Sequence, residues 1–367
     1  MSAPRRVTII SHSCVLPLNQ RLFAALAEYE DLDVRVIAPR HWVASLQGPL
    51  EFAALPELAQ RAEGWPVRRP GDLHRHTYPD LPRALGDQRP DVLYLDEDAH
   101  SLVASQVLGL QRKLDFRLIV TPKQNVLKRY LPPFGWIERA AYQRAAAAAA
   151  TSEECLAVAR RKGFAGPAVL VHYVVDTDLF APAATVPDRP FTVGYAGRLV
   201  PEKGVSDLLA AVATLPGIRL RVAGSGPDAP RLRRLAGALP SATVAWEPAL
   251  PPAAMPQWYH QCDVVVLPSR TARHWKEQFG RVLAEAQACG VAVIGSDSGF
   301  IPELLATTGG GLVYPEGDVV ALATALRQLA ADPTRRRELG AAGRAGVLAH
   351  YSPGVVAGRL HDLIVGL

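Results

Sequence analysis

The sequence predicts an α/β protein with two doubly wound parallel sheets, and three observations lead to this prediction. With 367 residues, the chain is long enough for two domains, each with its own core. Short β-branched runs alternate with longer helical patterns, which favours parallel strands joined by crossover helices. The alternation stops at the proline-rich stretch 181–190 and then restarts, so this stretch is interpreted as a linker.

The first half of the chain supplies the first predicted sheet. Its strands are apolar and β-branched, or rich in alanine, and are expected at 5–11, 32–39, 91–98, 116–122 and 145–151. Helical spacing at 19–30 and 100–114 fills two of the intervals, and Asn19 is a suitable N-cap for the first of these helices.

The second half repeats the same order of elements. Strands are expected at 191–197, 218–224, 242–247, 263–268, 291–296 and 310–315. Helices are expected at 205–215 and 231–239, after the Phe279-Gly280 pair, and at 354–367. The predicted domains are therefore 1–180 and 181–350, followed by a terminal helix within 351–367.

Composition excludes several classes of protein. The chain is 49% hydrophobic and 20% charged with a net charge of +5, which is ordinary for a globular enzyme and offers no nucleic-acid face. The four cysteines form no CxxC pair, which argues against a disulfide framework or a cysteine zinc site. The first apolar run is too short for a signal peptide, and no run reaches the ~20 apolar residues of a membrane span. We expect a cytoplasmic protein.

The loop after the strand at 191–197 carries two cations. Arg198 and Lys203 lie between Gly197 and Gly204, at the carboxyl end of a predicted parallel strand. Arginine can bind a pyrophosphate bidentately and lysine as a point charge. A solvated surface turn is the alternative interpretation.

The next strand ends in AGSGPDA, a formal GxGxxA pattern containing Gly224 and Gly226. Glu247 follows at the end of the next strand, as in dinucleotide-binding proteins, so an NAD(P)-dependent oxidoreductase is an alternative. Pro227 and Pro230 at the helix entry, and the position on the second strand of the domain, argue against it.

Two carboxylates flank the start of a predicted helix. Glu277 precedes the Phe279-Gly280 pair and Glu285 lies eight residues further on, inside the helix. Between them lie the unpaired amides of the first turn, which favour an anion. A sugar, a diphosphate and a ribose present hydroxyl, anion and hydroxyl in this order, so the spacing predicts a nucleoside-diphosphate sugar. A helix-start glutamate with a surface ion pair is the plainer alternative.

These motifs, GYAGRLVPEKG, VAGSGP, CDVVVLPS and EQFGRVLAEAQACGVAVIGSDSGFIPE, resemble the donor-binding half of retaining family 4 glycosyltransferases. That group is related to glycogen and sucrose synthases, and the E-x7-E spacing is its hallmark. The resemblance covers most of residues 190–350. It implies a GT-B fold: two facing Rossmann-like domains, a deep cleft between them and a last helix that crosses back to the first domain. It also implies a metal-independent transfer that retains anomeric configuration and needs no cofactor beyond the nucleotide sugar.

The resemblance also implies roles for individual residues. Arg198 and Lys203 would hold the diphosphate, Glu277 the hydroxyls of the donor sugar and Glu285 the ribose; Arg198, Lys203 and Glu277 would be the catalytic residues. The chain near 247–250 would border the base. The remaining donor-binding candidates lie on the same loops: Gly197, Gly224, Gly226, Gln278, Phe279 and Gly280.

The first half departs from the family pattern. Many relatives have a glycine pair after their first strand, where this chain has SHSCVLPLNQ, and a histidine where it has Lys123, Gln124 and Asn125. The acceptor-side candidates are polar residues after predicted strands: His12, Asp96, Asp98, His100, Gln124 and Asn125. The last residues of LDEDAH could instead cap a helix. Its D-x-D pattern binds metal in another glycosyltransferase fold, but we expect no metal here.

The basic and aromatic segment 126–144 could meet a membrane surface, although packing on its own domain is the preferred interpretation. The function predicted for the chain is transfer of a sugar from a nucleoside-diphosphate sugar to a hydroxyl of a saccharide, glycolipid or small molecule. A GT-B-fold epimerase or phosphorylase, and a non-catalytic nucleotide-sugar sensor, are the remaining alternatives.

Overall fold

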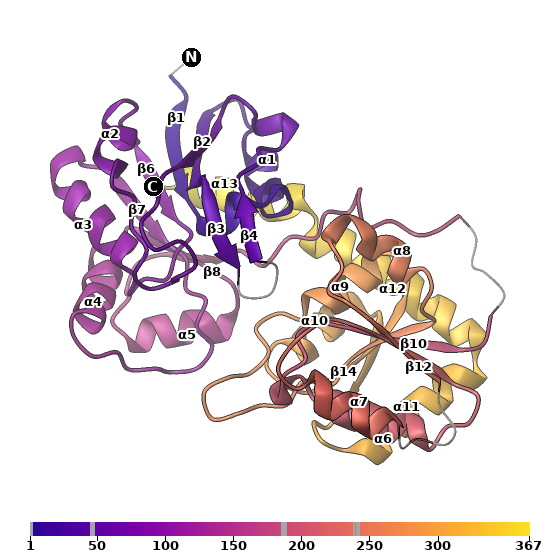
Figure 1. Cartoon of the computed structure of the whole chain (residues 1–367). Coiled ribbons are helices and arrows are strands. Elements are labelled where there is room, and N and C mark those ends of the chain that lie inside the picture. Colours follow the sequence, from indigo (N-terminus) through magenta and orange to yellow (C-terminus); the bar gives the residue numbers. More distant parts are fainter. Residues whose placement is uncertain (1–2, 45–47, 185–188, 238, 240–242) are drawn as a thin grey trace. The chain divides into compact units, whose positions relative to one another are not determined.

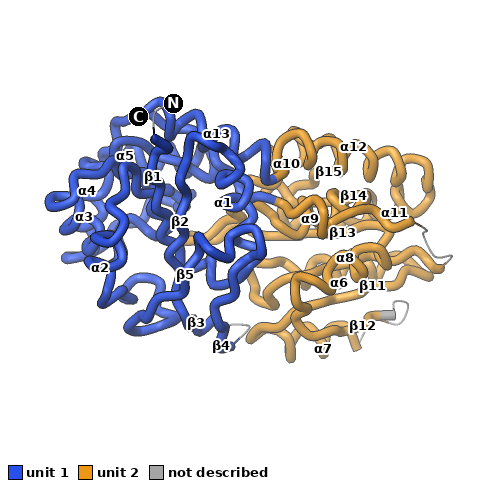
Figure 2. The backbone as a smooth tube through the Cα atoms, turned by 90° about the horizontal axis from the view of Figure 1, so that it is seen from above, with its two compact units in different colours: residues 1–174, 353–367 blue, residues 175–352 orange. Residues whose placement is uncertain are grey.

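The computed structural model divides the chain into two compact units (Figures 1 and 2). It describes residues 3–44, 48–184, 189–237, 239 and 243–367. Unit 1 contains residues 1–174 and 353–367, and unit 2 contains residues 175–352. The chain thus leaves unit 1 before residue 180, the expected boundary, and part of the expected linker at 181–190 lies outside the described residues.

Unit 1 is built on a seven-stranded parallel sheet with the order β5-β2-β1-β6-β7-β8-β9. Its strands are β1 (Arg5–Ile10), β2 (Leu32–Pro39), β5 (Ala62–Trp65), β6 (Val92–Leu95), β7 (Arg117–Val120), β8 (Ala147–Ala150) and β9 (Ala168–Leu170). The chain winds outward from β1 in one direction and from β6 in the other. The carboxyl ends of β1 and β6 therefore flank a topological switch point, where doubly wound sheets bind ligands.

Helices cover the two faces of this sheet. They are α1 (Arg21–Leu26), α2 (Leu81–Gly86), α3 (Leu102–Leu114), α4 (Phe134–Arg144), α5 (Glu153–Arg161) and α13 (Pro353–Val365). Val7 and Ile9 of β1 face a core that α1 and α13 complete, while Ile10 belongs to the core under α2, α3 and α4. A hairpin of β3 (His41–Ala44) and β4 (Gly48–Glu51) and the short helices η1 (His12–Val15), η2 (Pro17–Gln20) and η3 (Pro56–Leu58) complete the unit.

Unit 2 has six parallel strands in the order β12-β11-β10-β13-β14-β15. They are β10 (Thr192–Ala196), β11 (Arg219–Ala223), β12 (Thr243–Glu247), β13 (Val264–Leu267), β14 (Ala292–Ser296) and β15 (Gly311–Tyr314). Counted within the unit, this is the order 3-2-1-4-5-6 of the Rossmann fold, with its switch point between β10 and β13. The helices are α6 (Val205–Ala213), α7 (Ala229–Gly237), α8 (Met255–Tyr259), α9 (Arg281–Ala288), α10 (Ile301–Thr308), α11 (Val319–Ala331) and α12 (Pro333–Tyr351), with η4 (Pro201–Lys203) and η5 (Pro252–Ala254).

The predicted doubly wound fold is confirmed, and so is a last helix, α13, that belongs to the first unit. One detail was wrong: α1 begins at Arg21, and Asn19 is not its N-cap. The Asn19 side chain donates instead to the carbonyl oxygen of Ser13, 2.8 Å away, and so shapes the loop after β1. None of the helices among the described residues has the length and apolar character needed to cross a membrane.

Candidate functional site

The switch point of unit 2 brings two predicted donor residues into contact. Lys203 ends η4, which follows β10, and Glu277 lies on the loop that follows β13. The Nζ of Lys203 lies 2.5 Å from Oε2 of Glu277, and the same oxygen accepts a hydrogen bond of 2.8 Å from Ser269 Oγ. The ammonium also lies over the ring of Trp275, 5.0 Å from its centroid. Lysine and glutamate are therefore fixed side by side at the carboxyl edge of the sheet.

Arg198 lies on the same loop as Lys203 but is exposed. The buried Tyr195 donates its hydroxyl to the carbonyl oxygen of Arg198 at 2.8 Å, which anchors the backbone of the loop. The Arg198 guanidinium makes no hydrogen bond or ion pair to any residue that the structure describes. An anchored backbone with an uncommitted cation suits the binding of an anionic ligand.

Close backbone packing explains why AGSGPDA has glycine at positions 224 and 226. A Cβ on Gly224 would lie 1.9 Å from the carbonyl oxygen of Gly197, and one on Gly226 would lie 2.3 Å from that of Leu199. The amide of Leu199 donates to the carbonyl oxygen of Ser225 at 2.8 Å. These glycines thus let the loop after β11 pack directly on the loop that carries Arg198.

Glu247, the carboxylate required by the dinucleotide interpretation, is already bound to other side chains. Its two oxygens accept hydrogen bonds of 2.9 Å each from Arg221, and Trp258 Nε1 donates to it at 3.2 Å. A carboxylate held in this way is poorly placed to select a ribose hydroxyl, so the formal GxGxxA pattern lacks its acidic partner.

Helix α9 begins where the sequence placed it. Gly280 is its N-cap with φ +84°, a conformation that favours glycine. Phe279 is buried and stacks on Phe300 with ring centroids 5.5 Å apart, whereas Gln278 is exposed. The first-turn amides of α9 thus start beside a buried aromatic anchor, and Glu277 lies just before them.

Glu285 lies in the second turn of α9 and is largely buried, with 12% of its side chain exposed. The hydroxyl of the buried Tyr259 donates to its Oε2 at 2.7 Å, and Arg281 Nε lies 3.7 Å from Oε1. Burial raises the pKa of Glu285 above its usual value, although Arg281 and the Tyr259 hydrogen bond oppose the shift. A carboxylate with a perturbed pKa at the edge of a binding loop is typical of a functional site.

Most acceptor-side candidates lie in two clusters of unit 1, one around His100 and one around Glu97. Several of them already make hydrogen bonds or ion pairs. Asp96 accepts from Ser11 Oγ at 2.6 Å and pairs with Lys123 at 2.7 Å. His100 is buried, with its Nε2 2.7 Å from His74 Nδ1. Burial lowers the pKa of His100 to about 4.

The first cluster surrounds His100. Its ring stacks on that of Tyr130, with centroids 3.9 Å apart, and the Tyr130 hydroxyl accepts from Gln124 Nε2 at 2.7 Å. Asp98 lies 3.8 Å from His74, and Asn125 is buried. A small pocket of about 270 Å³ opens here, lined by Asp72, His74, Arg75, His100, Tyr130 and Phe134.

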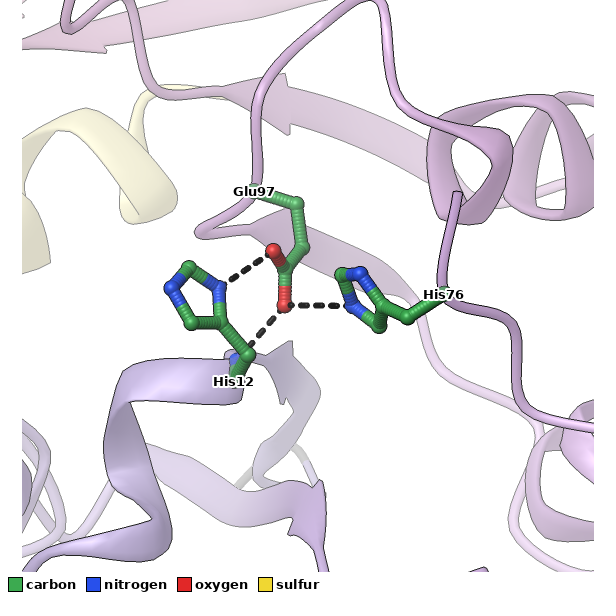
Figure 3. Close-up of side chains that lie close together, drawn as sticks. All are labelled: His12, His76 and Glu97. Atoms are coloured by element: carbon green, nitrogen blue, oxygen red, sulfur yellow. Dashed lines mark hydrogen bonds and ion pairs between the residues drawn. The ribbon is translucent and has the colours of Figure 1, made fainter. Parts of the chain in front are cut away.

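His12 belongs to the second cluster, around Glu97, which the sequence analysis did not predict. Its ring lies beside Glu97, and His76 approaches the same carboxylate from the opposite side (Figure 3). His74 and His76 were missed, although the H-x-H pattern at 74–76 could have signalled them. On spacing alone, His12 with His76 and Glu97, and His74 with Asp98 and His100, could each hold a metal ion.

The segment 126–144 forms a loop followed by α4, which packs on α3. Tyr130 from this loop is part of the His100 cluster. Leu131 and Trp136 remain 83% and 69% exposed, so the segment packs on its own unit and still presents two apolar side chains to solvent.

Comparison with known proteins adds a family to this geometry. Residues 176–346 match the family "Glycosyl transferases group 1". The GDP-mannose-dependent alpha-(1-6)-phosphatidylinositol monomannoside mannosyltransferase of Mycolicibacterium smegmatis is 34% identical over 221 residues, which is 55% of this chain and 58% of the relative. The alpha-maltose-1-phosphate synthase of the same organism is 33% identical over 59% of this chain and 62% of the relative. The chain thus matches somewhat more than half the length of these curated relatives.

Solved structures match over nearly the whole chain. Sucrose-phosphate synthase from Thermosynechococcus elongatus superposes with a TM-score of 0.76 at 22% identity, covering 99% of this chain and 98% of the other. HepE of Anabaena, solved in complex with UDP-glucose, gives 0.74 at 17% identity, covering 99% and 100%. At these identities the likeness shows the fold, which is GT-B. The two curated relatives are named as a mannosyltransferase and a synthase, not as an epimerase or an NAD-dependent oxidoreductase.

Proposed function

We propose that this chain is a group 1 glycosyltransferase of GT-B fold that transfers a sugar from a nucleoside-diphosphate sugar to an acceptor hydroxyl. The observation that carries the proposal is the pairing of Lys203 with Glu277 at the switch point of unit 2. This pair lies next to the start of α9, and Glu285 follows in the second turn. Glu277 can accept from sugar hydroxyls, Lys203 and the helix amides can bind the diphosphate, and Glu285 can accept from the ribose hydroxyls.

The proposed role of each group follows from its chemistry. The Lys203 ammonium and the exposed Arg198 guanidinium would neutralise the diphosphate, which gains charge as its bond to the sugar breaks. Glu277 would accept hydrogen bonds from the hydroxyls of the donor sugar, and Glu285 from those of the ribose. These groups supply charge and hydrogen bonds without a metal ion, so we propose a metal-independent transfer. We also propose retention of anomeric configuration, as the E-x7-E resemblance implies.

The proposed acceptor is a saccharide, a glycolipid or a small molecule bound to unit 1. Two of the curated relatives are named as mannosyltransferases that act on phosphatidylinositol monomannosides, which supports a glycolipid. The exposed Leu131 and Trp136 lie in the same segment as Lys128 and Arg129, and such a surface is suited to anionic lipid headgroups. We therefore propose a cytoplasmic enzyme that meets the inner face of the membrane peripherally.

Thermal unfolding with added nucleotides tests the donor site. Wild type, Glu285→Ala and the control Glu338→Ala would be unfolded with UDP, GDP, ADP, dTDP or NAD. Glu338 is a half-exposed carboxylate on α12 whose only partner among the described residues is Arg335. We expect one nucleoside diphosphate to raise Tm in the wild type and in Glu338→Ala, but not in Glu285→Ala. A shift with NAD alone, or an equal shift in all three proteins, would contradict the proposal.

Two further measurements test the chemistry. Transfer from the matching nucleotide sugar should continue in excess EDTA, and NMR of the product should show the anomeric configuration of the donor. Loss of transfer in EDTA that Mg²⁺ or Mn²⁺ restores would overturn metal independence, and an inverted product would overturn retention.

A further inference from the structure

A buried carboxylate lies between two imidazoles at the switch point of unit 1 (Figure 3). Glu97 follows β6 and is 1% exposed. Its Oε2 lies 2.5 Å from Nδ1 of His12, which begins η1 just after β1. Its Oε1 accepts the His12 backbone amide at 2.6 Å and lies 3.6 Å from Nε2 of His76. This polar group therefore occupies the position where a doubly wound sheet binds its ligand.

The protonation of His76 follows from its two neighbours. Its Nδ1 lies 3.0 Å from the carbonyl oxygen of Asp72, which can only accept, so Nδ1 carries a proton. Its Nε2 faces Glu97, and an unprotonated Nε2 would direct a lone pair at a carboxylate. A proton on Nε2 as well would make His76 a buried imidazolium facing Glu97 at 3.6 Å. Burial opposes the charged form, but the contacts of His76 with Glu97 raise its pKa above the usual value.

One buried positive charge then balances one buried negative charge. Burial alone would raise the pKa of Glu97, but its contacts with His12 and His76 hold that pKa well below the usual range. The carboxylate can only accept, so the Nδ1 of His12 carries the proton of their hydrogen bond. In the neutral ring the lone pair is then on Nε2.

The Nε2 of His12 has no partner among the described residues, and 20% of the side chain is exposed. The ring packs against Trp42, with centroids 5.0 Å apart, and against His76 at 5.8 Å. The other polar groups nearby do not compete for it: Asp96 is paired with Lys123, and burial raises the pKa values of Cys14 and Tyr78, which keeps them neutral. The ring is thus held from three sides, and in its neutral form the remaining nitrogen can only accept a hydrogen bond.

We infer that His12 accepts a hydrogen bond through Nε2 from a hydroxyl of the acceptor substrate, and that Glu97 and His76 hold it in the form able to do so. The identity of the ligand as an acceptor hydroxyl rests on the proposed function. A neutral acceptor nitrogen repels phosphate and carboxylate, so it selects a hydroxyl of a sugar or polyol. A metal centre fits less well, because the carboxylate itself occupies the space between the imidazoles and each ring faces its own oxygen.

Histidine NMR tests the charge states independently of any substrate. Protein labelled with ¹⁵N-histidine, with His12→Gln and His76→Gln for assignment, should show at pH 7.5 two protonated nitrogens on His76. His12 should be protonated on Nδ1 alone, and Glu97→Gln should convert His76 to the neutral form. Two protons on His12, a neutral His76 in the wild type, or a stoichiometric metal ion in the purified protein by mass spectrometry would overturn the inference.

Transfer assays test the contact with the acceptor. His12→Phe should lower kcat/KM for the acceptor by about tenfold or more, the effect of losing a hydrogen bond to a reacting hydroxyl. The Tm shift caused by the nucleoside diphosphate should be unchanged, because that site lies in unit 2. His41→Phe is the matched control, since His41 also pairs with a glutamate, Glu51, but on the exposed hairpin.

The outcomes separate the two proposals. Wild-type protein that neither binds a nucleoside diphosphate nor transfers a sugar would defeat the proposed function, and the NMR result would still stand. Normal transfer by His12→Phe would overturn the contact proposed here and leave the proposed function intact.

Discussion

At the scale of single residues, Glu285 has a carboxylate in surroundings that oppose its charge. Its side chain is largely buried, and within the described residues its close partners are a tyrosine hydroxyl and one arginine at 3.7 Å. Fold stability alone gives no reason for such a residue, since a neutral side chain would cost less there. The proposed ribose contact provides one.

Glu285→Gln should therefore improve stability and impair binding. A carboxyl with a raised pKa stabilises the fold at low pH, and this contribution is lost as pH rises through the folded-state pKa. At pH 7.5 the variant should unfold at a higher Tm than the wild type, and the difference should shrink as the pH is lowered. Nucleoside-diphosphate affinity should fall by about 10- to 100-fold, as for the loss of a charged hydrogen bond. Equal Tm values at every pH would contradict this account.

Glu97 presents the opposite case, a buried carboxylate that its partners favour. Its lowered pKa contributes stability above the ordinary value of 4.5, and this is lost as pH falls through the folded-state value. The raised pKa of His76 contributes stability below the ordinary 6.5, and this is lost as pH rises through its folded-state value. Both contributions are complete between pH 4.5 and 6.5.

At pH 6, Glu97→Gln should lower the free energy of unfolding by about 3–5 kcal/mol, because one partner of a buried pair is removed and His76 must lose its proton or stay charged without a counter-ion. Glu97→Gln with His76→Gln removes both charges and should recover part of the loss. Urea unfolding of the wild type, the two single variants Glu97→Gln and His76→Gln, and the double variant gives the coupling energy between the two residues. Strictly additive losses would show that the two residues are not a charge pair.

The sequence brought the proposed donor residues together more directly than the cluster around Glu97, for a physical reason. Glu277 and Glu285 lie eight residues apart, one just before α9 and one in its second turn, so their relation can be predicted from a short stretch of sequence. His12 and Glu97 meet because β1 and β6 are neighbours, and His76 reaches them from the segment between β5 and α2. Strand order is not encoded in local periodicity. His76 also lies in a stretch without clear periodicity, where no strand or helix was predicted.

At the scale of elements, the glycine after η4 holds the donor loops together. A Cβ on Gly204 would lie 1.9 Å from the carbonyl oxygen of Pro268, which follows β13, and its φ is +63°. Gly217, in the turn before β11, has a similar φ of +79° but open space around it. The two positions separate the cost of backbone strain from the cost of a clash.

Gly217→Ala should cost about 1–2 kcal/mol of unfolding free energy, the price of a left-handed conformation. Gly204→Ala should cost roughly 3 kcal/mol or more, because the backbone of the β13 loop must also move. Only Gly204→Ala should weaken nucleoside-diphosphate binding, since Lys203 is its neighbour. Chemical unfolding and titration of both variants check this, and equal effects at the two glycines would refute a packing role for Gly204.

Most strands and some of the helices were predicted, because their apolar periodicity reflects burial in parallel sheets. The elements not predicted include short strands and also the long helices α11 and α12. The β3–β4 hairpin lies outside the main sheet, and β9 contributes three partly buried residues at its edge. Helix α1 is shorter than its pattern because residues 17–20 form η2, which leads the chain from the His12 loop into the helix.

At the scale of the whole molecule, the chain has two separate sheets, and the residues proposed to bind the donor all belong to unit 2. Unit 1 is completed by α13, whose Val356, Leu360 and Ile364 are fully buried in the same core as β1 and α1. A ligand of unit 2 and a core mutation in α13 should therefore act on different parts of the unfolding process.

Calorimetry can show whether unit 1 and unit 2 unfold in separate transitions. Leu360→Ala should cost about 2–5 kcal/mol and lower the transition of unit 1 by roughly 4–20 °C, while Val355→Ala, at a more exposed position on the same helix, should change little. The matching nucleoside diphosphate at 100 times its Kd should stabilise unit 2 by about 2.7 kcal/mol and raise only the other transition. In Leu360→Ala with ligand, the two transitions should move apart. A single transition that responds to both changes would show that the units unfold together, because ligand binding to unit 2 would then also protect the core completed by α13.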